Sequence, residues 1–360
     1  MDRSRFDPTG FYRAMEESMS LQVARGEVRW MDLFSPPEAP VDVVLAFGCA
    51  VQHTPHLMLE ACQVFDALGI PFVAVTGRQF CCGRPFQRVG GDTVAADRIA
   101  AKSYERFLAF QPKVTVQWCG ACMLQYLDVI SRQIQPPFEV VHVTKYVLGL
   151  LRERGASIPW EREVRSRVLL HTHDQFLPQQ EIDARCIERI LEMVPGVELV
   201  GRVAPPSLGL PCSLQGPTQE SILKDITTEE YRAVQVELEE QAREAGADTL
   251  VMPYHKCQME WSKFSSRRLA VRGWMSVLAE ALGVGRPDLF TTYWHLNDAE
   301  EIVERSAPIW GSWGLSRDEA LDRARRHFIP RYAVEVHRCD CGGRGCGAPD
   351  LDLAWPTAAP

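Results

Sequence analysis

Short apolar runs rich in β-branched residues alternate with helical segments through the first third of the chain, and each run is followed within a few residues by cysteine. Runs of this kind are typical of strands that are buried on both faces of a sheet. Strands joined by helices run parallel, because only an antiparallel pair can be closed by a tight turn. The chain is therefore restricted to an α/β fold with a parallel sheet. The expected order is strand 41–47, helix 54–68, strand 71–76, helix 92–110 and strand 113–118.

The same order recurs in residues 166–257, which indicates a duplication. The offset from Cys82 to Cys212 nearly equals the offset from Cys122 to Cys257, as two related halves require. We therefore expect two related parallel-sheet α/β halves, the second degenerate, with a Cys/Gly-rich C-terminal tail. The predicted division is a helical lead-in at 1–40, a first cysteine-bearing domain at 41–160, a degenerate second domain at 161–295, and helices with a Cys-rich tail at 296–360.

Composition and charge predict a cytoplasmic protein that does not bind nucleic acid. The net charge is −8, whereas binding to phosphates needs clustered Lys and Arg. The first thirty residues mix charges of both signs, unlike a signal peptide, and no run approaches the roughly 18 apolar residues of a membrane span. In a reducing compartment the 12 cysteines are expected as metal ligands or redox groups rather than disulfides.

The five cysteines of the first half are predicted to meet at one edge of the sheet. Ligands of open α/β sheets bind beyond the carboxyl ends of the strands, where the loops converge. Cys49 follows the first strand, Cys81 and Cys82 follow the second, and Cys119 and Cys122 follow the third. Clustered thiolates bind iron–sulfur clusters or zinc. Buried reduced thiols are the alternative without a metal.

The spacing of these cysteines resembles a known motif. It reads Cys49, 31 residues, Cys81-Cys82-Gly83, 35 residues and Cys119-Gly120-Ala121-Cys122. This pattern resembles the CCG domain of the B-type polypeptide of heterodisulfide reductase, which also occurs in iron–sulfur subunits of glycolate oxidase and lactate utilisation. The resemblance implies a non-cubane 4Fe-4S cluster held by all five sulfurs, whereas a cubane cluster is held by four. Gly83 lets the backbone turn sharply beside the metal. Adjacent cysteines between long spacers do not suit a zinc ribbon.

Charged residues near the cysteines have functional and structural interpretations. Arg78, Arg84 and Arg88 offset the charge of the thiolates or recognise an acidic substrate group, or else they are simple surface residues. His53 and His56 follow the first cysteine at helical spacing, either as partners of a cluster or substrate or as capping and solvated residues. His53 and Arg84 are the nearest candidates for a catalytic role beside the cluster itself.

The second half has lost most of the ligands that a second motif needs. Phe176 stands in THDQF where a cysteine is expected, the pair is reduced to Cys212, and the closing Cys-x-x-Cys has become Tyr254-His255-Lys256-Cys257. A second non-cubane cluster is therefore not predicted. His171 and His173 end the preceding strand, where they transfer protons or hydrogen-bond the loop.

The tail sequence HRCDCGGRGCG is either a metal knuckle or a disordered end. A candidate second metal site, for zinc or a second iron–sulfur cluster, consists of Cys212, Cys257, Cys339, Cys341 and Cys346, with His171 or His255. By contrast, Cys62 and Cys186 lie among apolar residues of helical segments and are predicted to be core residues.

The resemblance implies a redox subunit of a heterodisulfide-reductase-like complex that acts on a disulfide, a thiol or carrier-bound sulfur. One intact motif favours the bacterial sulfur-oxidising form of that complex, in which a lipoate-bearing carrier protein presents the sulfur. Other iron–sulfur or flavin subunits are the expected partners, with Trp310 and Trp313 as anchors of the interface. The alternatives are an electron-relay subunit of a glycolate or lactate oxidase-type complex and a non-catalytic scaffold subunit.

Overall fold

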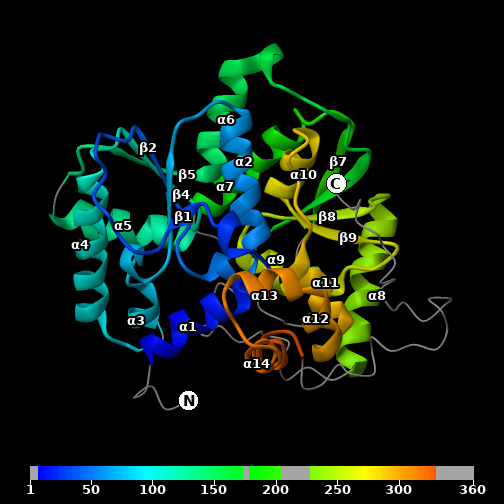
Figure 1. Cartoon of the computed structure of the whole chain (residues 1–360). Helices are drawn as coiled ribbons and strands as arrows, with labels where there is room; N and C mark the ends of the chain where they lie inside the picture. The colour runs from blue at the N-terminus through cyan, green and yellow to red at the C-terminus, as the bar shows by residue number, and fades with distance from the viewer. Residues whose placement is uncertain (1–6, 89, 134, 173–177, 204–227, 330–360) are drawn as a thin grey trace.

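Two parallel β-sheets organise the protein in a computed structural model, which describes residues 7–329 except 89, 134, 173–177 and 204–227 (Figure 1). The first sheet has the order β1-β3-β2-β4-β5, and all neighbouring strands are parallel. Its central strands β2 and β4 are buried throughout because helices cover both faces. The strands are β1 (Trp30–Met31), β2 (Val43–Ala46), β3 (Val73–Val75), β4 (Val114–Gln117) and β5 (Glu139–His142).

The second sheet repeats the order of the first without its edge strand β1. Its order is β7-β6-β8-β9, again all parallel, so β6 to β9 correspond in turn to β2 to β5. The predicted fold of two related parallel-sheet α/β halves is therefore confirmed in the described part of the chain. The strands are β6 (Ser166–His171), β7 (Val197–Val203), β8 (Thr249–Met252) and β9 (Ala270–Gly273).

A layer of four helices lies between the two sheets and joins the halves (Figure 1). Two of the helices follow strands of the first half and two follow strands of the second. Their apolar side chains form one continuous core with both sheets, so the halves are not separable units of packing. Both Cys62 and Cys186 belong to this core. The helices are α2 (Pro55–Ala67), α6 (Val143–Arg154), α7 (Pro178–Leu191) and α10 (Trp274–Ala281).

The outer faces of the sheets are covered by further helices with separate cores. The helix α4 (Thr93–Ala109) and the helix α5 (Gly120–Gln133) cover the first sheet. The helix α8 (Thr228–Ala245) and helices near the C-terminal end cover the second. The remaining helices are α1 (Pro8–Met19), α3 (Arg84–Arg88), α9 (His255–Trp261), α11 (Leu289–Leu296), α12 (Ala299–Arg305), α13 (Ala307–Ser312) and α14 (Arg317–His327).

The N-terminal lead-in forms part of the first half and also contacts the last described helix. Its strand β1 extends the edge of the first sheet beside β3. Its helix α1 packs against α14, where the Arg326 guanidinium donates to Glu17 at 2.7 Å and Arg323 donates to Ser20 at 2.7 Å. The first and the last described helices of the chain therefore pack against each other.

Several sequence predictions fall outside the described residues, namely those for His173, Phe176, Cys212, Cys339, Cys341 and Cys346. Within the described ranges, none of the helices combines the length and the apolarity that crossing a membrane requires.

Candidate metal centre

The five cysteines of the first half lie together beyond the carboxyl ends of β2, β3 and β4. Hydrogen bonds between side chains join Cys81 to Cys82, Cys82 to Cys122, and Cys122 to Cys119. Cys49 lies within electrostatic range of Cys82 and Cys119. The parallel sheet therefore brings all five predicted sulfurs to one place, because loops that leave neighbouring strands at the same edge converge.

Three of the five cysteines are buried and two are partly exposed. Cys81, Cys82 and Cys122 are at most 3% exposed. Cys49 and Cys119 keep some exposed surface. Even so, the protein surrounds Cys49 closely enough for burial to raise the pKa of its thiol, with the neighbouring cysteines adding to the shift. Of the five cysteines, Cys49 and Cys119 are therefore the two that are nearest to the surface.

Two glycines make room for the sulfurs. Gly48 has a φ of +81°, and a Cβ on it would lie 3.0 Å from the Cys122 sulfur. Gly83 has a φ of +80°, and a Cβ there would lie 2.1 Å from the carbonyl oxygen of Ala96 in α4. A left-handed backbone and contacts this close both require glycine. The expected role of Gly83 in the turn therefore has a structural basis.

The loop that carries the paired cysteines is fixed by the outer helices. Ser103 of α4 donates a hydrogen bond to the Cys81 carbonyl at 2.7 Å, and the hydroxyl of Tyr126 in α5 donates to the Phe80 carbonyl at 2.7 Å. The backbone N–H of Gly83 donates to the Cys81 sulfur at 3.2 Å. These bonds satisfy backbone groups that the turn would otherwise leave buried and unpaired.

The pKa values of the clustered thiols are shifted in different directions. Hydrogen bonds from Cys122 and Cys81 hold the pKa of Cys82 well below its ordinary value, and the positive charge of Arg84 acts in the same direction. The hydrogen bond with Cys82 raises the pKa of Cys81, and the bonds with Cys119 and Cys82 raise that of Cys122. The pKa of Cys119 is also lowered by its hydrogen bond with Cys122, so the arrangement favours the thiolate, which is the form that binds metal, at Cys82 and Cys119.

A tyrosine from the N-terminal helix completes the buried side. Tyr12 of α1 is 5% exposed, and its buried hydroxyl has no hydrogen-bond partner in the described structure. Cys81, Cys49 and Cys82 are near enough to act on it electrostatically, and Cys81 is the sulfur toward which it can donate. Burial, reinforced by these cysteines, raises the pKa of Tyr12, so the phenol keeps its proton and remains a donor toward sulfur.

The three candidate arginines differ in position. Arg84 opens α3 two residues after Cys82, and its backbone N–H bonds to Cys82 while its charge stabilises the same sulfur. Arg78 is exposed. The side chain of Arg88 lies outside the described residues. Among the described arginines of this loop, the geometry therefore assigns charge compensation to Arg84.

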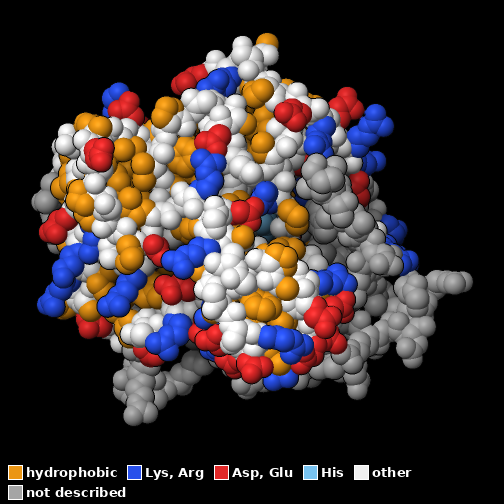
Figure 2. Space-filling model, viewed as in Figure 1, with side chains coloured by type: hydrophobic (Ala, Val, Ile, Leu, Met, Phe, Trp, Pro, Cys, Tyr) orange, Lys and Arg blue, Asp and Glu red, His pale blue; other side chains and the backbone are white. Residues whose placement is uncertain are grey.

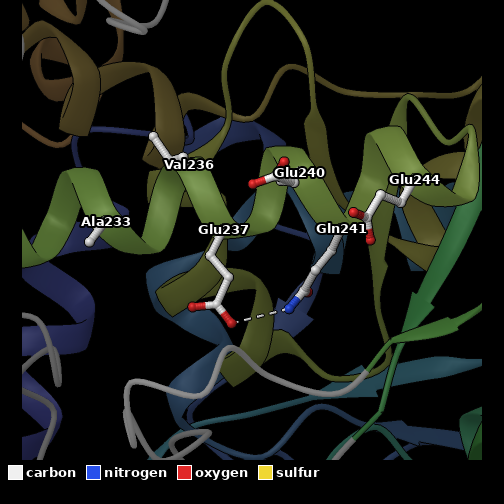
Figure 3. A pocket seen from close by; sticks show the side chains of 6 residues that line it. All are labelled: Ala233, Val236, Glu237, Glu240, Gln241 and Glu244. Carbon is white, nitrogen blue, oxygen red and sulfur yellow. Dashed lines mark hydrogen bonds between the residues drawn. The ribbon is translucent and has the colours of Figure 1, made fainter.

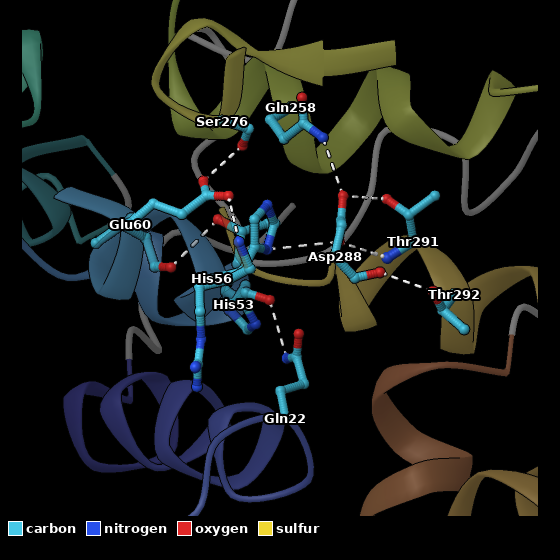
Figure 4. A network of polar contacts seen from close by, with 12 residues as sticks. Gln22, His53, His56, Glu60, Gln258, Ser276, Asp288, Thr291 and Thr292 are labelled. Atoms are coloured by element: carbon cyan, nitrogen blue, oxygen red, sulfur yellow. Dashed lines mark hydrogen bonds and ion pairs between the residues drawn. The ribbon is translucent and has the colours of Figure 1, made fainter. Parts of the chain in front are cut away.

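The two candidate histidines are buried in the contact between the halves. Burial lowers the pKa of His53 well below its ordinary value, and His327 and Lys256 nearby act in the same direction. His56 lies 3.5 Å from the Asp288 carboxylate, in a network that also joins Gln258 to Asp288 (Figure 4). A role for His53 at the cysteines remains a prediction, because its strongest electrostatic neighbours belong to other elements.

For the candidate second metal site, the structure describes only one of its cysteines. Cys257 is fully buried in the core of the second half. His171 is buried with its ring 5.7 Å from that of Trp261. Burial lowers the pKa of His255 to about 3, and positive charge nearby adds to the effect. The other four cysteines of this site lie outside the described residues, so the site stays a prediction.

A groove elsewhere on the molecule has a different character. It runs along α8 on the outer side of the second sheet, and acidic side chains dominate it (Figure 3). Within it, Gln241 donates a hydrogen bond to Glu237 at 3.3 Å. The groove is lined by Ala233, Val236, Glu237, Glu240, Gln241 and Glu244, and none of the five cysteines borders it.

The chemistry of the donor set suits a multi-iron cluster. Soft thiolates are the usual ligands of iron–sulfur clusters, and five of them occupy one partly enclosed space here. In the described residues, three or more His, Cys, Asp or Glu side chains do not converge as a group that would hold one metal ion. A multi-iron cluster does not need such convergence, since its ligands bind different irons.

Comparison with known families gives a match over the part of the chain that contains the five cysteines. Residues 43–126 match the model of the cysteine-rich domain named CCG. The first half contains a CCG domain. This CCG domain runs from β2 into α5 and includes all five cysteines. Tyr12, which lies beside the sulfurs, comes from outside the CCG domain.

Two relatives of the chain are subunits of dihydromethanophenazine:CoB–CoM heterodisulfide reductase, in each case the D polypeptide. The one from Methanosarcina barkeri is 24% identical over 148 residues, which cover 38% of this chain and 35% of the relative. The one from Methanosarcina mazei is 25% identical with the same coverage. The match therefore spans about a third of each relative's length. An aspartate racemase homologue from Pyrococcus horikoshii covers 67% of this chain and 97% of its own at 13% identity and a TM-score of 0.32, a likeness too weak to support any conclusion.

Four residues near the cysteines were missed by the sequence analysis: Tyr12, His142, Asp183 and Tyr254. The signal for Tyr254 was present, because it occupies the position in the second half that Cys119 occupies in the first. The other three carry no local pattern, and only the fold shows where their side chains lie.

Proposed function

We propose that the protein is an iron–sulfur redox subunit of a heterodisulfide-reductase-like complex. The proposal depends above all on the assembly of five sulfurs from three loops of the CCG domain. The similarity to heterodisulfide reductase subunits supports membership of such a complex. The proposed ligands of a non-cubane 4Fe-4S cluster are Cys49, Cys81, Cys82, Cys119 and Cys122. When bound, such a cluster supplies one-electron transfer and a place for a substrate sulfur.

The protein's own residues would shape how that chemistry proceeds. The buried side, with Cys81, Cys82 and Cys122, excludes water, and Arg84 offsets part of the thiolate charge. The partly exposed side, at Cys49 and Cys119, is where a substrate sulfur and an electron-transfer partner approach. Reduction of a disulfide takes up two electrons and two protons and yields two thiols, and oxidation is the reverse. Partner iron–sulfur or flavin subunits exchange these electrons one at a time.

The proposed substrate class is a disulfide, a thiol or carrier-bound sulfur. A lipoate-bearing carrier protein is the source we favour, because its dithiolane sulfurs sit on a long arm that can reach a site open on one side. We place this activity in the cytoplasm, where protein thiols stay reduced.

Metal analysis of anaerobically prepared protein tests the cluster. We expect about four irons per chain with acid-labile sulfide, and an electron paramagnetic resonance signal after oxidation or reduction. Cys82→Ala should lose the iron, because Cys82 is the central sulfur of the group. Cys62→Ala is the matched control, since Cys62 is a buried core cysteine of the same half and should keep it. Stoichiometric zinc without sulfide would contradict the proposal.

Activity of the reconstituted complex separates the proposed role from the alternatives. With an artificial one-electron donor, the chain and its partners should reduce a disulfide, and with an artificial one-electron acceptor they should oxidise a carrier thiol. Cys82→Ala should abolish both activities. Electron transfer that persists without any sulfur substrate being turned over would instead identify an electron-relay subunit.

A further inference from the structure

The two halves meet directly at the turn that carries Cys119 and Cys122. His142 ends β5 in the first half, Asp183 lies in α7 of the second half, and Tyr254 precedes α9. Asp183 is completely buried and His142 is 2% exposed. A carboxylate buried this deeply is costly unless it is fully paired, so its contacts are informative.

Asp183 is paired with groups from both halves. His142 Nδ1 lies 2.9 Å from Asp183 Oδ1, and Thr144 Oγ1 donates to the same oxygen at 2.8 Å. The Tyr254 hydroxyl donates to Asp183 Oδ2 at 2.7 Å, and Gln179 donates to Oδ1 at 2.9 Å. Burial alone would raise the pKa of Asp183, but His142 and these hydrogen bonds lower it overall. The carboxylate is therefore charged.

The same group of residues holds the cysteine turn on two sides. His142 Nε2 donates to the carbonyl of Trp118 at 3.1 Å, one residue before Cys119. One residue after Cys119, the Tyr254 ring lies 3.6 Å from the point where a Cβ on Gly120 would be. The rings of His142 and Tyr254 lie edge to face at 5.9 Å. Asp183 binds both side chains and so couples the two contacts.

Building on the proposed function, we propose that Asp183 is a positioning residue that, through His142 and Tyr254, fixes the Cys119 turn in ligand geometry. Tyr254 stands where a second motif would have the first cysteine of its closing pair. In this chain the position no longer presents a sulfur. It instead presents a ring against the turn of the other half, so the degenerate half holds the cysteine site of the intact one.

Substitutions in the second half test this without touching a cysteine. Asp183→Asn keeps the shape but removes the charge that pairs with His142, and Tyr254→Phe keeps the ring and removes the hydroxyl that binds Asp183. Asp288→Asn is the matched control, because Asp288 is also a buried carboxylate of the second half that caps α11, and its contacts are with His56, Gln258 and Thr291 rather than with the cysteine turn (Figure 4).

The first readout uses the reduced, metal-free chain. The rate at which iodoacetamide alkylates Cys119, located by peptide mass spectrometry, should rise several-fold in Asp183→Asn and by a smaller factor in Tyr254→Phe. Asp288→Asn should lower the melting temperature without changing that rate. Unchanged alkylation of Cys119 in both variants, or an equal rise in Asp288→Asn, would overturn the proposal.

The second readout uses the iron-loaded chain. Asp183→Asn should change the electron paramagnetic resonance spectrum and the reduction potential, whereas Asp288→Asn should leave both as in the unmodified protein. If the unmodified chain bound no iron, the proposed function would fail, and the alkylation rates would still decide whether Asp183 positions the turn. An unaltered spectrum in iron-loaded Asp183→Asn would count against the positioning role alone.

Discussion

Gly83 and Gly91, on either side of α3, have similar backbone conformations but differ in the space around them. Gly83 and Gly91 have φ values of +80° and +66°. A Cβ on Gly91 meets nothing within 4 Å, whereas a Cβ on Gly83 meets the backbone of Ala96 at 2.1 Å. The two positions therefore share the penalty for a left-handed residue but differ in the space that a methyl group needs.

We expect Gly91→Ala to lower the free energy of unfolding by about 1 kcal/mol, because only the backbone is strained. Gly83→Ala should lower it by about 3 kcal/mol or more, because the backbone of α4 must also move. Urea denaturation measures both. Equal losses of unfolding free energy in the two variants would show that the backbone of α4 at Ala96 moves aside at little cost. The close approach of Ala96 to Gly83 would then not explain why glycine is needed there.

The phenol of Tyr12 gives a second prediction. Hydrogen bonds to ligand sulfurs stabilise the reduced form of an iron–sulfur cluster, so Tyr12→Phe should move the reduction potential to a lower value. Tyr104→Phe is the control, because burial alone raises the pKa of Tyr104 and no cysteine acts on it. Redox titration followed by electron paramagnetic resonance makes the comparison. Identical reduction potentials in the Tyr12→Phe variant and the unmodified protein would show that the Tyr12 hydroxyl does not influence the site.

The five cysteines were predictable from sequence, and the residues that hold them were not. The cysteines follow strands that their β-branched composition reveals, and parallel strands bring such loops together. Asp183 sits in an ordinary amphipathic helix sequence, and its partners Thr144 and Tyr254 are 39 and 71 positions away. Contacts over such distances depend on how the halves pack, which no local pattern encodes.

At the level of elements, the long helices and central strands match the sequence predictions, whereas the edge strands β1 and β9 were not predicted. The strand predicted at 113–118 corresponds to β4 (Val114–Gln117), and helix 54–68 corresponds to α2 (Pro55–Ala67). β1 and β9, with the sequences WM and AVRG, are edge strands of two and four residues. Strands this short show no periodicity and form only because a neighbouring strand offers free backbone groups.

A buried histidine of helix α11 leads to a prediction of how the stability of the protein depends on pH. Burial lowers the pKa of His295 below its ordinary 6.5, although Lys263 and Asp288 act against the shift. The folded state therefore favours the neutral imidazole, and its stability is full above pH 6.5 and falls as the pH decreases below that value. The free energy of unfolding should be lower at pH 5.5 than at pH 7.5.

His295→Gln tests the assignment, since it removes the titrating group and should reduce the difference between the two pH values. His53, which is also buried with a lowered pKa, should retain part of the pH dependence. A difference unchanged by His295→Gln would assign the acid sensitivity to other groups.

At the level of the whole molecule, hydrophobic, acidic and basic side chains are intermixed on the face seen in Figure 2. The most exposed large apolar residues, Leu33, Val94 and Val236, belong to different segments. The expected anchors Trp310 and Trp313 are only partly exposed, and their indole N–H groups donate within the chain to Val303 and Val23. The partly exposed cysteines Cys49 and Cys119 therefore guide our prediction of where the proposed redox partner binds.

We predict a stable hetero-oligomer with at least one iron–sulfur or flavin subunit that contacts the side of Cys49 and Cys119. Affinity purification from the source cell followed by native mass spectrometry should recover that complex. Finding only monomers or homo-oligomers that alone turn over a disulfide would contradict the prediction.

The contact between α1 and α14 has a consequence for how the protein is made. Glu17 and Arg326 are 309 positions apart in the chain, yet their contact helps to hold the helix that carries Tyr12. All five cysteines emerge from the ribosome long before residue 326 does. The contact of α14 with α1 therefore forms only after all five cysteines have been synthesised, and before then α1 can already pack on residues Ala50–His53 of the first half.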